Sequence, residues 1–245
     1  YKQLEDHSNA FAAALVDMGL KKGDRVVIVM PNCTAFAIAY YGILKAGGVV
    51  AATNPTYPAA KMQYQINDCD AEIVVCISMF YKLIQQVQPE TKVKKIIVAN
   101  IKEYMHPFAK LLFTLAREKK DGHFVEQLGT NDHFFQDVLK KYAGQKPNVT
   151  IEPDDLCIFQ YTGGTTGVSK GAASPHRAMV TNSYQLQKWT GMADNKFAVP
   201  IDQILFLGAI PMFHSYGLLA MLTQAVVAGG SIVLIPNPRD IDEVV

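Results

Sequence analysis

Short apolar runs alternate with amphipathic patterns along the first part of the chain. The runs are rich in Val and Ile and predict buried strands, whereas the segments between or before them place apolar residues at helical spacing. The predicted strands are Arg25–Met30, Val49–Thr53, Ile73–Ile77 and Lys95–Val98. The predicted helices are Leu4–Met18, Thr34–Lys45, Ala59–Asn67 and Met79–Gln86. This alternation predicts βαβ units and a mostly parallel sheet that is covered by helices on both faces.

A second alternation occupies the last part of the chain. Its predicted strands are Leu156–Gln160, Gly171–Ser174, Gln203–Leu207 and Ser231–Ile235, and its predicted helices are Arg177–Lys188 and Leu218–Val227. We therefore expect an α/β protein of layered, mostly parallel sheets flanked by helices. One α/β subdomain is expected in residues 1–150 and a second in residues 151–245.

Residues 101–150 join the two alternations and form the most polar stretch of the chain. Within them, an apolar stripe at helical spacing is flanked by basic residues. The stripe consists of Met105, Phe108, Leu111, Leu112 and Leu115, and the basic residues are Lys102, Lys110, Arg117, Lys119 and Lys120. Two interpretations stay open: either the stripe packs on the core with its lysines in solvent, or residues 103–120 lie on an anionic membrane surface.

The composition is that of a globular protein, with 49% hydrophobic and 18% charged residues in 245. The formal net charge of +1 and the lack of a basic stripe interleaved with aromatics argue against a nucleic-acid partner. The longest apolar region, Ile204 to Ile235, is interrupted by polar residues, Pro211 and paired glycines. We therefore do not expect a membrane-spanning helix there.

The four cysteines are scattered through or beside apolar segments, without a CxxC pair or a histidine at zinc-finger spacing. They are Cys33, Cys69, Cys76 and Cys157. This pattern predicts buried, reduced thiols of a cytoplasmic protein. The histidines His7, His106, His123 and His133 are isolated from one another, so they are expected on the surface or on helix faces and not as metal ligands.

The segment Tyr161-Thr-Gly-Gly-Thr-Thr-Gly-Val-Ser-Lys-Gly171 follows a predicted strand directly. Its glycines free backbone N–H groups for close approach, its hydroxyls can donate hydrogen bonds and its lysine supplies a mobile positive charge. These groups suit a polyphosphate. The candidate ligand-binding residues are Thr162, Gly163, Gly164, Thr165, Thr166, Gly167, Ser169 and Lys170. Because a second strand follows, we expect the loop at a sheet edge, without the dipole of a helix N-terminus.

Better-known glycine loops do not fit this segment. In a Walker loop counted from Gly164, Ser169 stands where the second glycine belongs and Gly171 where Ser or Thr belongs. The dinucleotide pattern G-x-G-x-x-G is also absent. A glycine-rich surface hairpin is the remaining alternative.

The residue order resembles the phosphate loop of the adenylate-forming superfamily, which comprises acyl-CoA synthetases, luciferases and peptide-synthetase adenylation domains. That loop reads roughly [YF]-T-[SG]-G-[ST]-T-G-x-[PST]-K-G, and every position from Tyr161 to Gly171 fits it. With glycine at the third position, the loop is similar to that of bacterial long-chain fatty acyl-CoA ligases in particular. Further segments that resemble the family in order are Tyr1–Ala12, Gly23–Asn32, Gly42–Gly47, Asn54–Tyr57 and Pro211-Met-Phe-His-Ser-Tyr-Gly217.

Two positions depart from the family pattern. A customary acidic position is Lys61, and Ser174-Pro-His-Arg-Ala178 stands where L-T-H-R-N is common. The departures concern packing more than chemistry, although the second leaves the start of the following helix open.

The resemblance implies part of the large N-terminal domain of an ATP-dependent ligase that converts a long-chain fatty acid to acyl-AMP and then to acyl-CoA. ATP, Mg²⁺ and coenzyme A are the implied ligands, with Mg²⁺ held through the phosphates and Thr166 a candidate direct contact. Lys170 and His214 are the implied catalytic residues, His214 by placing the carboxylate beside the α-phosphate. A cytoplasmic location is expected, with peripheral contact at the inner face of the membrane if residues 103–120 bind lipid.

Family segments for adenine, ribose and the C-terminal lysine do not occur before Val245. We therefore expect that the chain lacks the C-terminal half and does not complete catalysis alone. Two alternatives stay open. The first is another adenylate-forming enzyme, namely an aryl- or medium-chain acyl-CoA ligase or an acyl-AMP ligase. The second is a non-catalytic, membrane-associating module.

Overall fold

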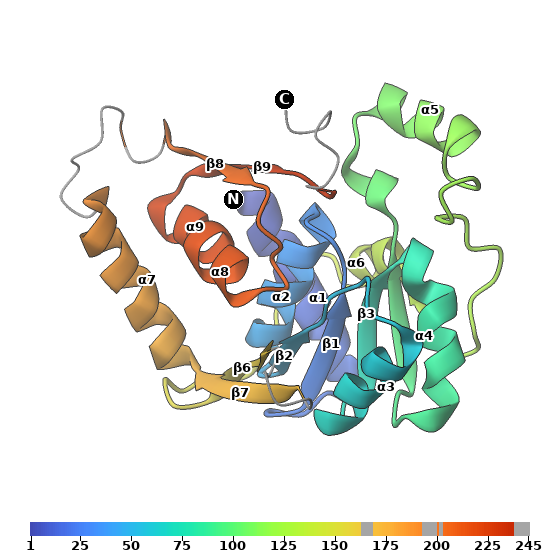
Figure 1. Ribbon diagram of the computed structural model, residues 1–245, viewed down its shortest axis with the longest axis horizontal. Helices are drawn as coiled ribbons and strands as arrows, with labels where there is room; N and C mark the ends of the chain where they lie inside the picture. The colour runs from blue at the N-terminus through green and yellow to red at the C-terminus, as the bar shows by residue number, and fades with distance from the viewer. Residues whose placement is uncertain (163–168, 193–199, 201–202, 238–245) are drawn as a thin grey trace.

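The computed structural model describes residues 1–162, 169–192, 200 and 203–237. In this part of the chain the main sheet has seven strands in the order β5-β4-β3-β1-β2-β6-β7 (Figure 1). The strands are β1 (Arg25–Val29), β2 (Val49–Ala52), β3 (Ile73–Ile77), β4 (Lys95–Ala99), β5 (His133–Phe134), β6 (Leu156–Thr162) and β7 (Lys170–Pro175). Neighbouring strands are parallel except for the antiparallel pair β6–β7. The expected α/β class with a mostly parallel sheet is confirmed.

The strands predicted in the first alternation are present, and their ends differ from the predicted ones by one residue at most. Local periodicity suffices here because β1 to β4 are almost entirely buried, which requires apolar side chains on both faces. The helices before and between them are α1 (Lys2–Asp17), α2 (Thr34–Lys45), α3 (Ala59–Asp68) and α4 (Tyr81–Val87). The helix predicted from Met79 begins as a 3-10 turn, η1 (Ser78–Phe80), and η2 (Gln88–Glu90) follows α4.

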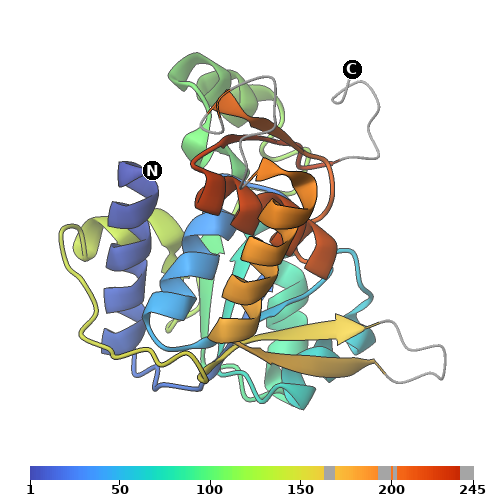
Figure 2. The same ribbon diagram turned by 90° about the vertical axis from the view of Figure 1, so that its left-hand side faces the viewer.

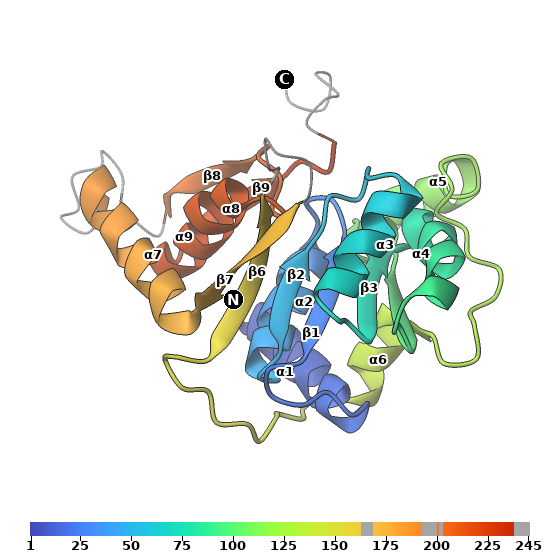
Figure 3. The ribbon, with the colours of Figure 1, turned by 60° about the horizontal axis from the view of Figure 1, so that its bottom comes forward.

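Helices cover both faces of the sheet. One core lies between the strands and α1, α2 and α6, and the other lies under α3 and α4, which run side by side in Figure 3. The α1–α2 contact is close because Gly42 has no side chain. A Cβ at that position would lie 2.7 Å from Cδ1 of Phe11. This approach buries Phe11 completely in the first core.

The second alternation adds α7 (His176–Thr190), β8 (Leu205–Gly208), α8 (Ser215–Gly217), η6 (Leu218–Thr223), α9 (Gln224–Ala228) and β9 (Ser231–Leu234). Strands β8 and β9 pair in parallel as a separate two-stranded sheet. The helix predicted over Leu218–Val227 is present, but its first part, η6, is π-helical. Helix α7 starts at His176, within the segment Ser174–Ala178 that departs from the family pattern.

The main sheet crosses the expected subdomain boundary. Strand β6 pairs with β2 through Val50 and Ile158, so two strands of residues 151–245 extend the sheet built by residues 1–150. The antiparallel β6–β7 hairpin forms the edge of this sheet (Figure 2). The division into subdomains at residue 150 stays a prediction.

Residues 101–150 contribute η3 (Ile101–Tyr104), α5 (Pro107–Ala116), β5 and α6 (Phe135–Lys141). The periodicity did not predict β5 or α6, because two strand residues and seven helix residues are too few to show a period. Helix α5 begins with Pro107, and His106 Nδ1 accepts a hydrogen bond from the Phe108 N–H at 3.4 Å. None of its residues is buried. Within the described structure, the interpretation that the apolar stripe packs on the core is therefore wrong for its α5 residues Phe108, Leu111, Leu112 and Leu115, whereas Met105 before the helix is half-buried.

Helices long and apolar enough to cross a membrane are absent from the described residues.

Candidate functional site

The ends of the predicted phosphate loop lie opposite each other at the sheet edge. Strand β6 ends at Thr162 and β7 begins at Lys170, and these residues are paired in the antiparallel ladder. The expected strand–loop–strand arrangement is therefore present. Residues 163–168, which include the predicted contacts Gly163, Gly164, Thr165, Thr166 and Gly167, lie outside the described residues.

Hydrogen bonds hold the loop ends in place. The Ser169 hydroxyl is buried and donates to the Thr162 carbonyl at 2.9 Å, and Tyr64 OH donates to the Ser169 carbonyl at 3.1 Å. The Thr162 hydroxyl lies 3.4 Å from the Lys170 carbonyl oxygen. Ser169 would have to exchange its present bond in order to contact a phosphate. Lys170 is exposed at the start of β7, where its ammonium can reach an anion.

Helix α3 supports the same hairpin from the neighbouring layer. Tyr161 OH donates to Asp68 Oδ2 at 2.6 Å, and burial together with this carboxylate raises the pKa of Tyr161. The phenol therefore stays neutral and keeps its proton for the hydrogen bond. Lys61, which replaces a customary acidic residue, places its ammonium 3.7 Å from the centre of the Tyr57 ring. Lys61 thus has a local packing role through this cation–π contact, although it departs from the family pattern.

The segment Pro211–Gly217 forms a tight turn that leads into α8. The His214 N–H donates to the Pro211 carbonyl at 3.0 Å, and His214 Nδ1 accepts from the Tyr216 N–H at 3.4 Å. A Cβ on Gly217 would collide with the Pro211 carbonyl oxygen, so the turn requires glycine there. The His214 side chain is exposed. The turn thus presents an imidazole ring whose Nδ1 is held by the backbone.

Two amide side chains attach this turn, which we call the His214 turn, to the main sheet. Asn32 follows β1 and is only 3% exposed. Its Nδ2 donates to the carbonyls of Gly208 and Ile210 at 2.8 and 2.9 Å, and its Oδ1 accepts from the Met212 N–H at 2.7 Å. From β6, Gln160 Nε2 donates to the Phe213 carbonyl at 3.0 Å.

Gln160 stands two positions before Thr162, so one strand carries both the phosphate-loop end and a contact to the His214 turn. The sequence did not single out Asn32 or Gln160. A signal was nevertheless present, because Asn32 is a polar residue three positions after the end of a buried strand and closes a segment that resembles the family. A polar side chain at such a position is typical of a structural or ligand contact.

A cavity of about 600 Å³ lies at the carboxyl ends of the parallel strands. Its wall comes from residues that follow β1 to β4 and from the His214 turn. They include Pro31, Thr56, Phe80, Ile101 and Phe213. Open α/β sheets bind ligands outside the carboxyl ends of their strands, where the strand order reverses. The order β3-β1-β2 contains such a reversal, so this cavity is a candidate substrate site.

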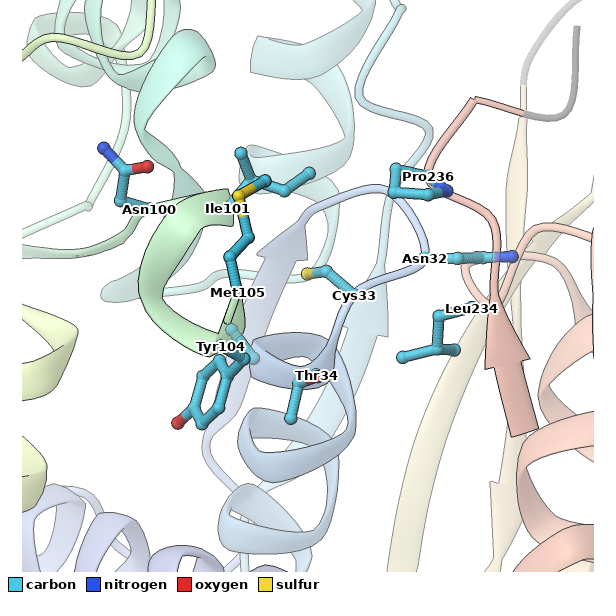
Figure 4. Close-up of a pocket in the computed structure, with 10 residues that line it drawn as sticks. Asn32, Cys33, Thr34, Asn100, Ile101, Tyr104, Met105, Leu234 and Pro236 are labelled. Carbon is cyan, nitrogen blue, oxygen red and sulfur yellow. The ribbon is translucent and has the colours of Figure 1, made fainter. Parts of the chain in front are cut away.

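A smaller cavity of about 170 Å³ shares Asn32, Ile101 and Met105 with the first, and Figure 4 shows the Cys33 side chain pointing toward η3 there. Burial raises the pKa of the Cys33 thiol to about 12, so this cysteine is not a thiolate nucleophile at neutral pH. Its expected burial is confirmed, as for Cys69, Cys76 and Cys157, and all of them are free thiols.

Glu103 in η3 makes the stability of this region depend on pH. Burial raises its pKa from 4.5 to about 7, although the Asn100 N–H and Gln136 Nε2 donate to the carboxylate and lower it in part. The folded chain therefore keeps a proton that the unfolded chain releases above about pH 4.5. Its stabilising contribution is complete below that pH and is lost as the pH rises through 7.

We expect the free energy of unfolding to fall by about 1–3 kcal/mol more in the wild type than in Glu103→Gln between pH 5 and pH 8. Urea unfolding at both pH values measures this difference. Glu126→Gln, at an exposed position, is the control and should follow the wild type. Equal pH slopes for the wild type and Glu103→Gln would show that the carboxyl ionises as it does in water.

Residues 1–245 match the AMP-binding enzyme family over their whole length. The chain therefore belongs to this family, and the expected place in the adenylate-forming superfamily is confirmed. In sequence it is 32% identical over 228 residues to the long-chain-fatty-acid–CoA ligase of Bacillus subtilis (strain 168), covering 92% of this chain and 40% of that protein. It is 26% identical to 4-coumarate–CoA ligase 1 of Solanum tuberosum, covering 96% of this chain and 37% of that protein.

Solved structures agree on the fold. ATP-bound MatB from Rhodopseudomonas palustris superposes with a TM-score of 0.74 at 24% identity, over 97% of this chain and 40% of that one. The anthranilate CoA ligase AuaEII in complex with anthranoyl-AMP superposes with a TM-score of 0.75 at 19% identity, over 96% of this chain and 40% of that one. The chain thus spans about two fifths of the length of these proteins.

Proposed function

We propose that this chain forms part of the acyl-AMP-forming site of a long-chain fatty acid–CoA ligase. The observation that carries the proposal is the convergence on β6 of the phosphate-loop end at Thr162 and, through Gln160, the His214 turn. Both segments fit family motifs, and the turn borders the cavity at the carboxyl ends of the strands. The 32% identity to a bacterial long-chain ligase supports the choice of substrate.

In the proposed first reaction, a carboxylate oxygen of the fatty acid attacks the α-phosphorus of ATP. The bond from that phosphorus to the bridging oxygen breaks, and acyl-AMP and pyrophosphate form. Lys170 would contact the β- and γ-phosphates and stabilise the charge that grows on the leaving group. The loop hydroxyls and N–H groups would add hydrogen bonds, and Mg²⁺ would be held through the phosphates.

His214 would orient the carboxylate. Because its Nδ1 accepts from the backbone, Nε2 carries the proton of the neutral ring and can donate to a carboxylate oxygen. In the second reaction the thiol of coenzyme A would lose its proton to solvent, its sulfur would attack the acyl carbon, and AMP would leave with the oxygen that linked it. The turn and its Asn32 anchor serve both reactions by keeping the ring at a constant place.

A carboxylate panel tests this proposal. Pyrophosphate release by the full-length protein that contains this chain is measured with long-chain, medium-chain and aromatic acids, and acyl-CoA formation is measured after coenzyme A is added. We expect kcat/KM for a long-chain acid to exceed that for an aromatic acid at least about tenfold, since each extra buried methylene contributes about 0.8 kcal/mol. A preference for an aromatic or medium-chain acid would assign another ligase of the superfamily. Pyrophosphate release with none of the acids would leave the non-catalytic module.

A further inference from the structure

Helix α5 carries a row of exposed apolar side chains along one face. Phe108, Leu111, Leu112 and Leu115 are 67%, 56%, 51% and 77% exposed. They fall at i, i+3, i+4 and i+7, so they project from the same side of the helix. In Figures 1 and 3 α5 lies at the periphery of the molecule, away from the main sheet. This surface, which we call the α5 face, is thus an unpartnered apolar stripe in the described structure.

The segment around the α5 face is positively charged. Residues 102–120 contain five Lys or Arg and two Glu, which is a formal charge of +3, whereas the whole chain carries +1. Both glutamates are partly or fully withdrawn from the surface, since Glu118 is buried in an ion pair with Lys102 and Glu103 is half-buried in η3. Lys110, Lys119 and Lys120 are exposed. The charge presented to a partner is therefore basic.

Buried polar contacts fix the orientation of α5. Asn100 Nδ2 donates to Glu118 Oε1 at 3.0 Å and to the His123 carbonyl at 3.1 Å. The His123 Nδ1 lies 2.9 Å from the Ser78 hydroxyl at the carboxyl end of β3. These contacts join the residues after α5 to the ends of β3 and β4. These contacts consequently keep the α5 face directed outward, so that it does not pack against the core.

The opposite side of α5 belongs to the candidate substrate cavity. Phe113 lines the 600 Å³ cavity and packs edge-on against His123, with ring centres 5.6 Å apart. Arg117 and Met105 line the same cavity. One short helix therefore separates the cavity from the exposed apolar stripe.

We propose that the α5 face docks on an anionic lipid bilayer and so holds the candidate substrate cavity at the membrane surface. The apolar side chains would enter the boundary between headgroups and acyl chains, and the lysines would face anionic headgroups. Docking needs no ATP or fatty acid. Only its use for drawing a bilayer-partitioned fatty acid into the cavity rests on the proposed function.

Vesicle co-sedimentation of the full-length protein tests the docking. Vesicles of phosphatidylcholine alone are compared with vesicles that also contain phosphatidylglycerol, at low and high salt. We expect binding to the anionic vesicles, weakened several-fold by high salt because screening removes the contribution of each lysine. The double variant Phe108→Ser/Leu112→Ser should bind at least about tenfold more weakly, since two large apolar side chains no longer enter the bilayer.

Val180→Ser/Tyr184→Ser is the matched control. These residues are 54% and 62% exposed on α7 and have the same i, i+4 spacing, so their replacement should leave vesicle binding unchanged. If Phe108→Ser/Leu112→Ser unfolds in a thermal melt, Lys119→Glu/Lys120→Glu takes its place, because these exposed residues can reverse charge without disturbing the core.

Several outcomes would overturn the proposal. They are no binding of the wild type to anionic vesicles, equal binding by the wild type and the α5 variants, or concentration-dependent self-association that the α5 variants abolish without lipid. The last result would assign the face to a second copy of the chain. Pyrophosphate release with a short, water-soluble acid is measured in parallel. Since that acid does not depend on the bilayer, its turnover separates failure of docking from failure of the proposed reaction.

Discussion

Lys170→Ala is expected to slow acyl-AMP formation by about 10- to 150-fold, because a hydrogen bond from a charged group to phosphate contributes about 1.5–3 kcal/mol. Lys170 begins β7 opposite Thr162, at one end of the predicted phosphate loop. The effect should fall on the adenylation rate and not on folding, since the side chain is exposed. ATP–pyrophosphate exchange by the full-length protein measures it.

Lys82→Ala is the control, since Lys82 is an exposed lysine on α4, outside the hairpin. It should leave the exchange rate within about twofold of the wild type. Lys170→Arg keeps the charge but changes its shape, and should retain part of the activity. An exchange rate for Lys170→Ala within twofold of the wild type would remove this residue from the phosphate site.

Asn32→Leu is expected to destabilise the fold by about 3–5 kcal/mol. It removes three hydrogen bonds and leaves the Ile210 carbonyl and the Met212 N–H without their partner, whereas the Gly208 carbonyl still accepts from the Ile235 N–H. The His214 turn loses its attachment to β1 at the same time. Adenylation should therefore fall at least about tenfold even where the variant stays folded, because catalysis depends on the position of the turn.

Urea unfolding followed by circular dichroism measures the stability, and pyrophosphate exchange below the unfolding transition measures the activity. Asn67→Leu is the matched substitution at an exposed asparagine with one hydrogen bond, from its Nδ2 to the Glu90 carbonyl. It should cost less than about 1 kcal/mol. If Asn32→Leu lowered the free energy of unfolding no more than Asn67→Leu, water or backbone movement would be replacing the lost hydrogen bonds. Asn32 would then not be the residue that attaches the His214 turn to β1.

The first four strands of the main sheet in chain order could be predicted closely, because the sequence information that specifies them is local. Strands β1 to β4 are buried on both faces, so each is a continuous apolar run bounded by polar residues. The phosphate-loop prediction also rests on local information, since its glycines, hydroxyls and lysine are contiguous from Thr162 to Lys170. It stays a prediction, because residues 163–168 lie outside the described residues. The hairpin around it followed from two flanking β-rich runs.

Contacts between distant segments were beyond such reasoning. Periodicity shows that a helix has an apolar face but does not name what covers it, so α5 could equally have packed on the core, and only the tertiary structure places its stripe outward. In the same way, the pairing of β6 with β2 and the bonds of Asn32 to residues 208–212 depend on chain topology.

The sequence by itself thus determined the α/β class, strands β1 to β4 and the phosphate-loop motif, because each depends on residues that are neighbours in the chain. Only the tertiary structure decided that the loop end and the His214 turn meet on β6, that a cavity opens beside them, and that α5 faces outward. Those features depend on contacts between separate segments of the chain; Gln160 and Phe213, for example, are 53 positions apart. No local pattern records such a contact, since the fold alone brings the two residues together.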